Sequence, residues 1–350
     1  MNNLTNVLNT KNIMFNNTSL KYIKPKNLSL NYSKIHPKSD DVIIEVDSCG
    51  MCGSDLKMFN NGSIRLKKNR VMGHEIAGTI KRAPKNQSYF KVNSQIALGA
   101  DIENHKNFAI GHEIDGGFQK YLKINKNILM RLPHYISKKK IKSDILALTE
   151  PLACCLNGIE KIGLKSKKNV LIFGSGSIGQ LIAKLCVLNK SNKIFLVDKD
   201  KFKLTNGIKD RNVIKLNLKT YKKKIQIFLK DNSIDYVFVA CSSAKAQEEA
   251  VNVASNGSSI NFFAGLTKKN MIDPMIKINT NMIHYKQLKV VGSHGSERRH
   301  VIKAAKLLIN NKIKVDSLIT HRIPINEYNL AFKIMNKNKY IKIILKPGKK

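Results

Sequence analysis

Residues 170–179 have the sequence VLIFGSGSIG, in which an apolar run passes directly into the glycine pattern G-x-G-x-x-G. The run predicts a buried strand, and the apolar stretch 178–188 predicts a helix that follows it. In this strand–turn–helix context the pattern is typical of a dinucleotide-binding turn. Gly174 permits the tight turn, Gly176 lets the backbone approach a pyrophosphate, and Gly179 lets the helix pack on the strand.

The predicted coenzyme site continues into the helix and along the next strand. Ser177 and Ile178 open the helix, whose N-terminal N–H groups favour phosphate. Asp198 lies at the end of the next predicted strand, where it would accept hydrogen bonds from ribose hydroxyls and repel a 2′-phosphate. We therefore expect NAD rather than NADP, with Lys203 flanking the same ribose. The alternative is a glycine-rich turn in another kind of doubly wound protein.

Strands and helices alternate over the segment that surrounds this turn. Further strands are predicted at 193–197, 235–241, 258–264 and 287–292, and helices at 201–208, 221–229, 246–254 and 299–310. Such alternation predicts a doubly wound parallel sheet with helices on both faces. The strand at 287–292 is the candidate edge for pairing with a second subunit.

The rest of the chain has a different pattern. Short apolar or alternating runs at 11–15, 39–46, 75–81 and 95–98 predict strands that no long helix follows. Apolar spacing over 145–162 predicts a helix that must break or restart at Pro151. The alternation at 340–345 predicts a strand that belongs with this β-rich part. We expect an α/β protein of two domains, which is ordinary for 350 residues.

Four side chains upstream of the glycine turn predict a metal site. They are Cys52, the pair His74 and Glu75, and Glu150. These residues offer a thiolate, an imidazole and a carboxylate, and three such protein ligands suit a catalytic zinc ion with an open fourth position. The C-x-x-C spacing that ends at Cys52 would need a second pair at matching spacing to form a zinc knuckle. The adjacent cysteines at 154–155 cannot supply it.

Composition excludes several classes of protein. The net charge is +38, but only eight of the 62 basic residues are arginines and the lysines are spread along the chain. We therefore expect a basic, solvated surface without specific nucleic-acid binding. Six cysteines in so long a chain do not indicate a disulfide framework. Without a signal-peptide pattern or an apolar run of membrane-spanning length, we expect a cytoplasmic protein with no membrane partner.

The chain resembles the zinc-dependent medium-chain dehydrogenase/reductase superfamily, most closely its sorbitol (L-iditol) or polyol dehydrogenase branch. The motifs that carry this resemblance are CGMCGSD (49–55), GHEIAG (73–78), DGGFQKYL (115–122), EPLACCLNGIEKIG (150–163), GSGSIG (174–179), NFFAGL (261–266), NTNMIHYKQL (279–288) and ITHRIPINE (319–327). The resemblance implies a GroES-like, β-rich catalytic domain made of residues 1–155 and 297–350. It further implies an inserted Rossmann NAD-binding domain of residues 156–296, in a homodimer or homotetramer.

Carried over position by position, the resemblance implies roles for the candidate site residues. Cys52 and His74 would be ligands of one catalytic zinc ion. Glu75 and Glu150 would be the third ligand and a carboxylate that exchanges with it, in an order that the sequence leaves open. Ser54, two residues after the ligand cysteine, would accept and pass on the substrate proton.

Two departures from the family pattern bear on this site. Lys57 stands where many relatives carry the histidine that ends the proton relay, so we expect proton release through water unless the pKa of Lys57 is lowered. The stretch 98–115 lacks the four cysteines of a structural zinc lobe, and we expect no structural zinc. Its histidines, His105 and His112, are interpreted as surface-loop residues.

The implied reaction interconverts a secondary alcohol, above all a polyol, and its ketone by hydride transfer to or from NAD, with zinc as Lewis acid. One alternative is the same fold acting on a simple secondary alcohol, a threonine-like amino alcohol or an aminocyclitol. Another is a non-catalytic, basic nucleic-acid-binding protein that keeps a dehydrogenase fold. The presence together of Cys52, His74, Glu75 and Glu150 argues against the latter.

Overall fold

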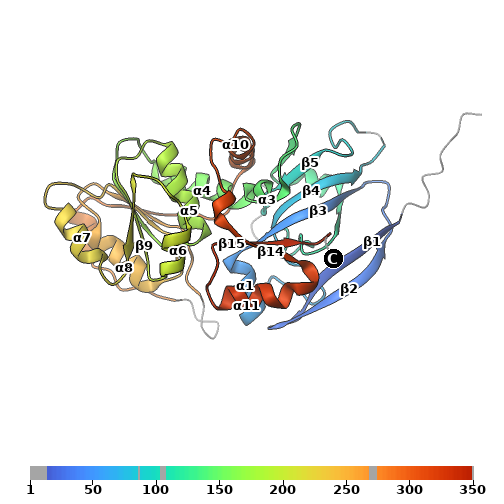
Figure 1. The fold of residues 1–350 in the computed structure, drawn as a ribbon, viewed down its shortest axis with the longest axis horizontal. Coiled ribbons are helices and arrows are strands. Elements are labelled where there is room, and N and C mark those ends of the chain that lie inside the picture. The colour runs from blue at the N-terminus through green and yellow to red at the C-terminus, as the bar shows by residue number, and fades with distance from the viewer. Residues whose placement is uncertain (1–13, 86, 103–107, 268–273, 349–350) are drawn as a thin grey trace, which may run out of the picture.

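The computed structural model describes residues 14–85, 87–102, 108–267 and 274–348, which form two lobes that each contain a large sheet (Figure 1). The α/β lobe is built on a sheet of six strands, and the β-rich lobe on a sheet of seven. Helix α4 (Thr149–Ile162) lies between the lobes, where it packs against α10 (Arg298–Ile309) and α5 (Ser177–Leu188). No helix in the described ranges is long and apolar enough to cross a membrane.

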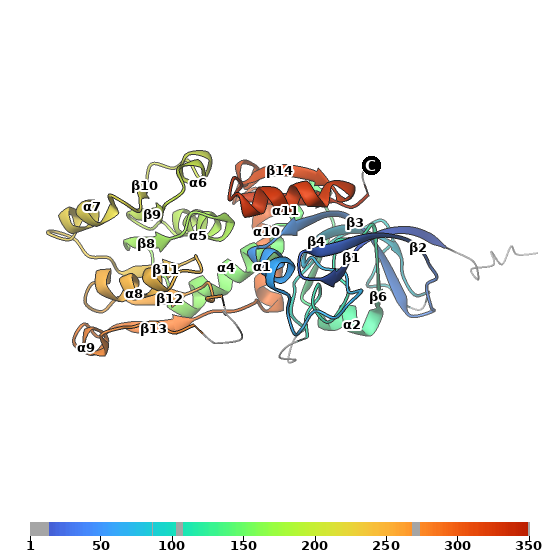
Figure 2. The ribbon, with the colours of Figure 1, turned by 90° about the horizontal axis from the view of Figure 1, so that it is seen from below.

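The six-stranded sheet is parallel throughout, in the order β10-β9-β8-β11-β12-β13. Its strands are β8 (Val170–Phe173), β9 (Ile194–Asp198), β10 (Val213–Asn217), β11 (Tyr236–Val239), β12 (Ser259–Phe262) and β13 (Lys289–Gly292). The helices that accompany them are α5, α6 (Lys201–Asn206), α7 (Tyr221–Phe228), α8 (Ala244–Val253) and α9 (Thr280–Tyr285). The predicted doubly wound architecture is confirmed, and the predicted edge strand, β13, lies at the edge (Figure 2).

Burial on both faces explains the apolar sequence of β8. Val170 and Ile172 pack in one core cluster with residues of α4 and α5. Leu171 and Phe173 pack in another with residues of α7 and α8. Strands covered by helices on both sides have near-continuous apolar sequences, which made this sheet recognisable. Strand β10 was not predicted, because its alternating sequence VIKLN suits an edge position where it is only partly buried.

The β-rich lobe joins both ends of the chain. Its sheet runs β14-β15-β3-β4-β5-β7, with β6 also paired to β3. The strands are β3 (Asp41–Met51), β4 (Glu75–Arg82), β5 (Gln95–Leu98), β6 (Tyr121–Asn125), β7 (His134–Ser137), β14 (Ile319–Pro324) and β15 (Lys342–Lys346). Strand β15 pairs antiparallel with β3, Leu345 opposite Cys49, so the predicted place of the C-terminal strand is confirmed.

Several smaller elements complete this lobe. They are the hairpin β1 (Phe15–Lys24) and β2 (Asn27–Ile35), with α1 (Gly53–Asn61), α2 (Lys126–Arg131), α3 (Ser143–Leu146) and α11 (Tyr328–Asn336). The strand predicted at 11–15 falls mostly outside the described residues, and β1 begins at Phe15. The helical segment restarts as predicted: α3 ends at Leu146, and Pro151 lies in the first turn of α4, where its missing N–H is tolerated.

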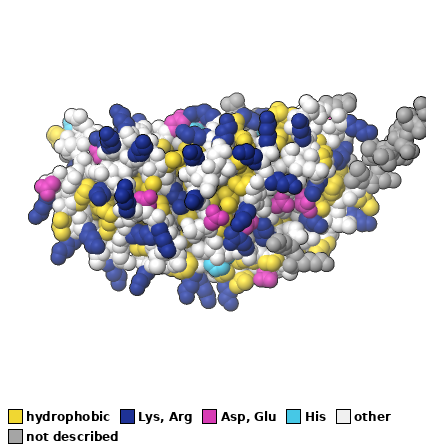
Figure 3. Space-filling view, turned by 45° about the horizontal axis from the view of Figure 1, so that its top comes forward, with side chains coloured by type: hydrophobic (Ala, Val, Ile, Leu, Met, Phe, Trp, Pro, Cys, Tyr) yellow, Lys and Arg dark blue, Asp and Glu magenta, His cyan; other side chains and the backbone are white. Residues whose placement is uncertain are grey.

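Basic side chains cover the face shown in Figure 3. They are scattered over both lobes and interrupted by apolar and acidic side chains, with no continuous basic stripe on this face.

Candidate active site

A cavity of about 390 Å³ lies between the lobes and is lined by residues of both. Cys52, Ser54, Lys57, His74, Glu75 and Glu150 line one side, and Ile178, Ser242, Gly265 and Gly295 come from the α/β lobe. A larger hollow of about 740 Å³, lined by residues such as Glu45 and Lys81, lies elsewhere on the β-rich lobe. Within the described residues, the compact group of metal-ligating side chains borders the first cavity.

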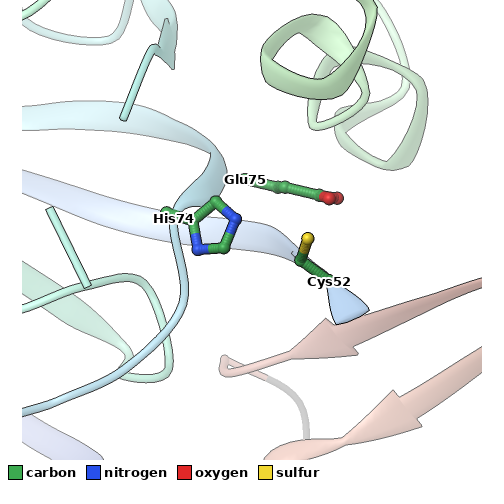
Figure 4. Close-up of side chains that lie close together, drawn as sticks. All are labelled: Cys52, His74 and Glu75. Atoms are coloured by element: carbon green, nitrogen blue, oxygen red, sulfur yellow. The ribbon is translucent and has the colours of Figure 1, made fainter. Parts of the chain in front are cut away.

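This group is Cys52, His74 and Glu75, whose potential ligand atoms all lie within 4.8 Å of one another (Figure 4). Sheet pairing brings them together from positions 52 and 74–75 of the sequence. Glu75 opens β4 and lies opposite Gly50 of β3, and Cys52 follows the end of β3 as the N-cap of α1. Gly50 makes room for the carboxylate, because a Cβ there would lie 1.9 Å from Glu75 Oε2.

Asp55 holds the backbone of Cys52 and lies beside His74. Its side chain is fully buried, and Oδ2 accepts a hydrogen bond of 2.8 Å from the Cys52 backbone N–H. Oδ1 lies 3.7 Å from His74 Nδ1. Burial lowers the pKa of His74, but the negative charges of Asp55 and Cys52 outweigh it and hold that pKa well above its ordinary value. A carboxylate behind a histidine orients the ring of a metal ligand. Asp55 was not predicted, although it lies within the quoted motif CGSD.

Glu75 is also paired with a lysine from the far end of the chain. Lys342 Nζ lies 2.7 Å from each carboxylate oxygen of Glu75 and donates to the Met51 carbonyl oxygen at 3.1 Å. Both side chains are 1 % exposed. Burial opposes the charge of Lys342, but Glu75 overcomes it and raises the pKa of Lys342. Lys342 was not predicted to take part in the site.

Glu150 approaches the same cavity from the first turn of α4. Burial raises its pKa to about 7, against the opposing charge of His74. The Cys154 thiol, one helical turn later, donates to Glu150 Oε1 at 3.3 Å. Among the described residues, the group with ligand atoms within 4.8 Å of one another does not include Glu150.

The glycine turn has the backbone geometry that its sequence predicts. Gly174 adopts a φ of +102°, which side chains disfavour. Gly179 packs against it so closely that a Cβ at 179 would lie 1.8 Å from the Gly174 carbonyl oxygen. Gly176 precedes α5 with open space beside it, and no side chain caps the helix there. Ser177 and Ile178 form the first turn of α5, with Ile178 also lining the cavity.

Asp198 closes this turn from the end of β9. Its Oδ2 accepts from the Ser175 backbone N–H at 2.6 Å, and its Oδ1 accepts from the Asp200 backbone N–H at 2.9 Å. Lys203 points elsewhere than predicted: Nζ donates to Asn338 Oδ1 at 3.0 Å and lies 5.6 Å from the centre of the Tyr340 ring. Its side chain therefore bridges the two lobes rather than contacting Asp198.

Comparison with known proteins finds relatives among the alcohol and polyol dehydrogenases. Residues 38–134 match the alcohol dehydrogenase GroES-like domain. The chain is 25% identical to D-arabinitol dehydrogenase 1 of Uromyces fabae, over 95% of this chain and 97% of that protein. It is 24% identical to sorbitol dehydrogenase of Halalkalibacterium halodurans, over 89% and 93%. These matches support the predicted resemblance to the zinc-dependent medium-chain dehydrogenase/reductase superfamily and its polyol dehydrogenase-like branch.

Solved structures confirm the fold of this dehydrogenase. The 2R,3R-butanediol dehydrogenase from Bacillus subtilis superposes with a TM-score of 0.83 at 18% identity, over 95% of this chain and all of that one. A short chain alcohol dehydrogenase from E. coli CFT073, solved with NADH, gives 0.82 at 19%, over 95% and 100%. The predicted combination of a GroES-like domain with a Rossmann-type sheet is confirmed, and the protein is an oxidoreductase of the alcohol dehydrogenase type.

The proton-relay candidates of this dehydrogenase lie on α1. Ser54, in its first turn, lines the cavity. Lys57, one turn further along, donates to Ser242 Oγ at 2.9 Å and to the Gly265 carbonyl oxygen at 3.2 Å, both in the α/β lobe. Burial lowers the pKa of Lys57, with the charge of Cys52 opposing this. Lys57 is thus a contact between lobes, which the sequence did not predict.

The interpretation of His112 as a surface-loop residue was wrong. It lines the cavity, and the centre of its ring lies 5.9 Å from that of His74. Burial, with the charges of His74 and Arg65, lowers its pKa to about 4. Its Nδ1 is buried and makes no hydrogen bond in the described part of the chain. The other histidine of this stretch, His105, lies outside the described residues.

Proposed function

We propose that this dehydrogenase interconverts a polyol, or a similar secondary alcohol, and the corresponding ketone, with zinc and NAD as cofactors. The observation that carries the proposal is the convergence of sulfur, nitrogen and oxygen donors from Cys52, His74 and Glu75 beside a cavity that also borders the glycine turn. The named activities of the relatives support it, since they include D-arabinitol and sorbitol dehydrogenases.

The side chains fit a zinc ion. Thiolate, imidazole and carboxylate are ligands that zinc accepts, and three protein ligands are typical of a catalytic site. Two buried polar atoms, His74 Nδ1 and Asp55 Oδ1, have no hydrogen-bond partner among the described residues, although they lie 3.7 Å apart. A small rotation of the ring would pair them and present its other nitrogen to a metal, the usual arrangement of a histidine ligand. Cys52, His74 and a carboxylate from Glu75 or Glu150 would hold the ion.

A bound zinc ion would act as a Lewis acid that makes the substrate hydroxyl easier to deprotonate. Ser54 would accept that proton, because its hydroxyl can donate and accept hydrogen bonds beside the ligand group. Lys57, whose pKa is lowered by burial, would pass it toward water at the edge of the cavity. The contact of Lys57 with Ser242 and Gly265 would fix the two lobes at the distance that hydride transfer requires.

The coenzyme would be NAD. Its pyrophosphate would take the N-terminus of α5, at Gly176, Ser177 and Ile178, because the N-cap residue, Gly176, has no side chain to occupy the N–H groups. Asp198 carries a negative charge at the end of β9, which would accept the ribose hydroxyls and repel the phosphate of NADP. Its two bonds to backbone N–H groups hold the carboxylate in a fixed position. Lys203, which contacts Asn338, would not contribute in this conformation.

The proposal includes two domains in each subunit and an assembly of subunits. Residues 1–155 and 297–350 would form the catalytic domain around residues 156–296. Two subunits would pair along β13, the edge strand of the six-stranded sheet. An edge strand offers unpaired N–H and C=O groups to a partner.

The test is the substitution Cys52→Ser, with Cys186→Ser, a buried thiol in α5, as the matched control. Zinc content by atomic absorption and NAD reduction with sorbitol, D-arabinitol, threonine and 2-butanol are measured for each. We expect Cys52→Ser to lose zinc and at least a thousandfold in kcat/KM, while Cys186→Ser keeps both. Full activity of zinc-free Cys52→Ser protein would end the proposal, and a preference for threonine or 2-butanol would change its substrate.

A further inference from the structure

Besides the ligand group, the cavity between the lobes is lined by a second set of polar side chains, which no motif explains. Asp101 follows β5, and Arg65, His112 and Gly295 line the same cavity. The carboxylate of Asp101 faces Gly295 so closely that a Cβ at 295 would lie 2.4 Å from Oδ2. Glu150 and Cys154 line the same cavity as Asp101.

The charge at this end of the cavity is negative. Arg65 is neutralised by Glu113, with Nε 2.7 Å from Oε1 and the second guanidinium contact at 3.0 Å. Glu113 is held further by the Ala109 backbone N–H at 2.9 Å. Asp101 has neither an ion-pair partner nor a side-chain hydrogen bond in the described part of the chain. Glu113, and to a lesser extent Asp101, raise the pKa of Arg65, so one guanidinium charge is shared between two carboxylates. These three side chains together carry one excess negative charge.

The carboxylate of Asp101 would favour substrates with hydroxyl groups over substrates with anionic groups at this position. It accepts hydrogen bonds from hydroxyl groups, and two oxygens suit the two hydroxyls of a vicinal diol. It repels a phosphate or carboxylate at the same place. The overall charge of +38 does not reverse this, because exposed charges beyond about 8 Å are screened at physiological salt. The relatives include one enzyme named for a neutral polyol, D-arabinitol dehydrogenase 1, and one named for a phosphorylated polyol, D-arabitol-phosphate dehydrogenase.

We infer that Asp101 is a specificity-determining residue that binds the hydroxyls of a neutral polyol remote from the reacting carbon, and that it excludes phosphorylated polyols and sugar acids. The buried Nδ1 of His112, which lacks a partner among described residues, supplies a second polar atom for the same hydroxyls. This inference rests on the proposed function and names the substrate class of that site.

The experiment compares the zinc- and NAD-loaded wild type with Asp101→Asn. Asp231→Asn removes an equal charge from an exposed position and serves as the control. Substrates are sorbitol, D-arabinitol, their terminal phosphate esters, and 2-butanol, which has no remote hydroxyl. We expect the wild type to favour each neutral polyol over its phosphate by at least about tenfold in kcat/KM. Asp101→Asn should raise KM for the polyols roughly 10- to 100-fold and change 2-butanol less than about twofold.

A better rate with the phosphate esters, or an equal loss of polyol and 2-butanol activity in Asp101→Asn, would overturn the inference. Failure of the proposed function is separate, because then the wild type oxidises none of these alcohols. Isothermal titration of each polyol into the NADH complex still tests Asp101 in that case. Binding that is weakened in Asp101→Asn but kept in Asp231→Asn supports the inference, and equal binding by all three proteins contradicts it.

Discussion

Replacing Lys342 by methionine tests how the carboxylate of Glu75 is held inside the β-rich lobe. The ammonium group lies 2.7 Å from both carboxylate oxygens and 3.1 Å from the Met51 carbonyl oxygen, and the lysine side chain is 1 % exposed. Methionine keeps most of the volume but leaves Glu75 as an uncompensated buried anion. Removing one partner of a buried ion pair costs about 3–5 kcal/mol, so the free energy of unfolding should fall by that amount.

The assay is urea unfolding followed by circular dichroism, in the presence of a chelator so that no metal binds the stranded carboxylate. Lys342→Arg preserves the charge and serves as the control. Adding Glu75→Gln to Lys342→Met removes the stranded charge, and we expect the double variant to be more stable than Lys342→Met by about 2 kcal/mol or more. This recovery distinguishes a charge effect from a packing effect.

The pH dependence of this loss follows from the sign of the pKa shift. Glu75 raises the pKa of Lys342 above its model-compound value of 10.5, against the effect of burial. The pair therefore contributes its full stability below that value and loses it only as pH rises through the folded pKa. The stability that the wild-type pair contributes should therefore be constant between about pH 6 and pH 9. A cost below about 1 kcal/mol, or a double variant as unstable as the two single changes added, would refute the reasoning.

Two further predictions concern other parts of the fold. Gly179→Ala should weaken NADH binding in a fluorescence titration and lower the unfolding free energy by about 1–3 kcal/mol, because its Cβ would overlap the Gly174 carbonyl oxygen; unchanged values would contradict the close packing. Asp144→Asn should cost about 1–2 kcal/mol at pH 7, after allowance for solvent screening, because Lys346 and Arg322 outweigh burial and lower the pKa of Asp144 to about 2. That stability is present above the unfolded pKa of 3.8 and is lost toward pH 2, so the variant and wild type should converge in acid unfolding curves; a constant gap would contradict it.

The α/β lobe could be predicted almost strand by strand because its signals are local. Val170–Phe173 is buried on both faces and has an unbroken apolar sequence, and the glycine turn follows it at once. The β-rich lobe gave weaker signals, since several of its strands have a solvent-facing side. Strands β6 and β7 were missed for this reason: YLKIN and HYIS are only partly buried.

The candidate site could be predicted only as far as its motifs extend. Cys52, His74 and Glu75 lie in short, recognisable motifs, so their grouping was expected from the sequence. Lys342 and Asp101 lie in stretches with no motif, and their importance depends on pairing across the fold. Lys342 reaches Glu75, 267 positions away in the sequence, because β15 pairs with β3. In a chain so rich in lysine, nothing in the sequence distinguishes this one.

The structure explains why two carboxylates accompany one cysteine and one histidine. Glu75 lies closer to Cys52 and His74. Both of its oxygens, however, accept hydrogen bonds from the ammonium group of Lys342, so the Glu75 carboxylate would have to bind Lys342 and a metal ion at the same time. Glu150 lies outside that compact group, but its described partner is a thiol, a weak donor, at 3.3 Å. Burial raises its pKa to about 7, and a nearby cation would favour its ionised form. One carboxylate is therefore near but held by Lys342, and the other is freer but farther away; under the proposed function, either could supply the third ligand of a metal ion.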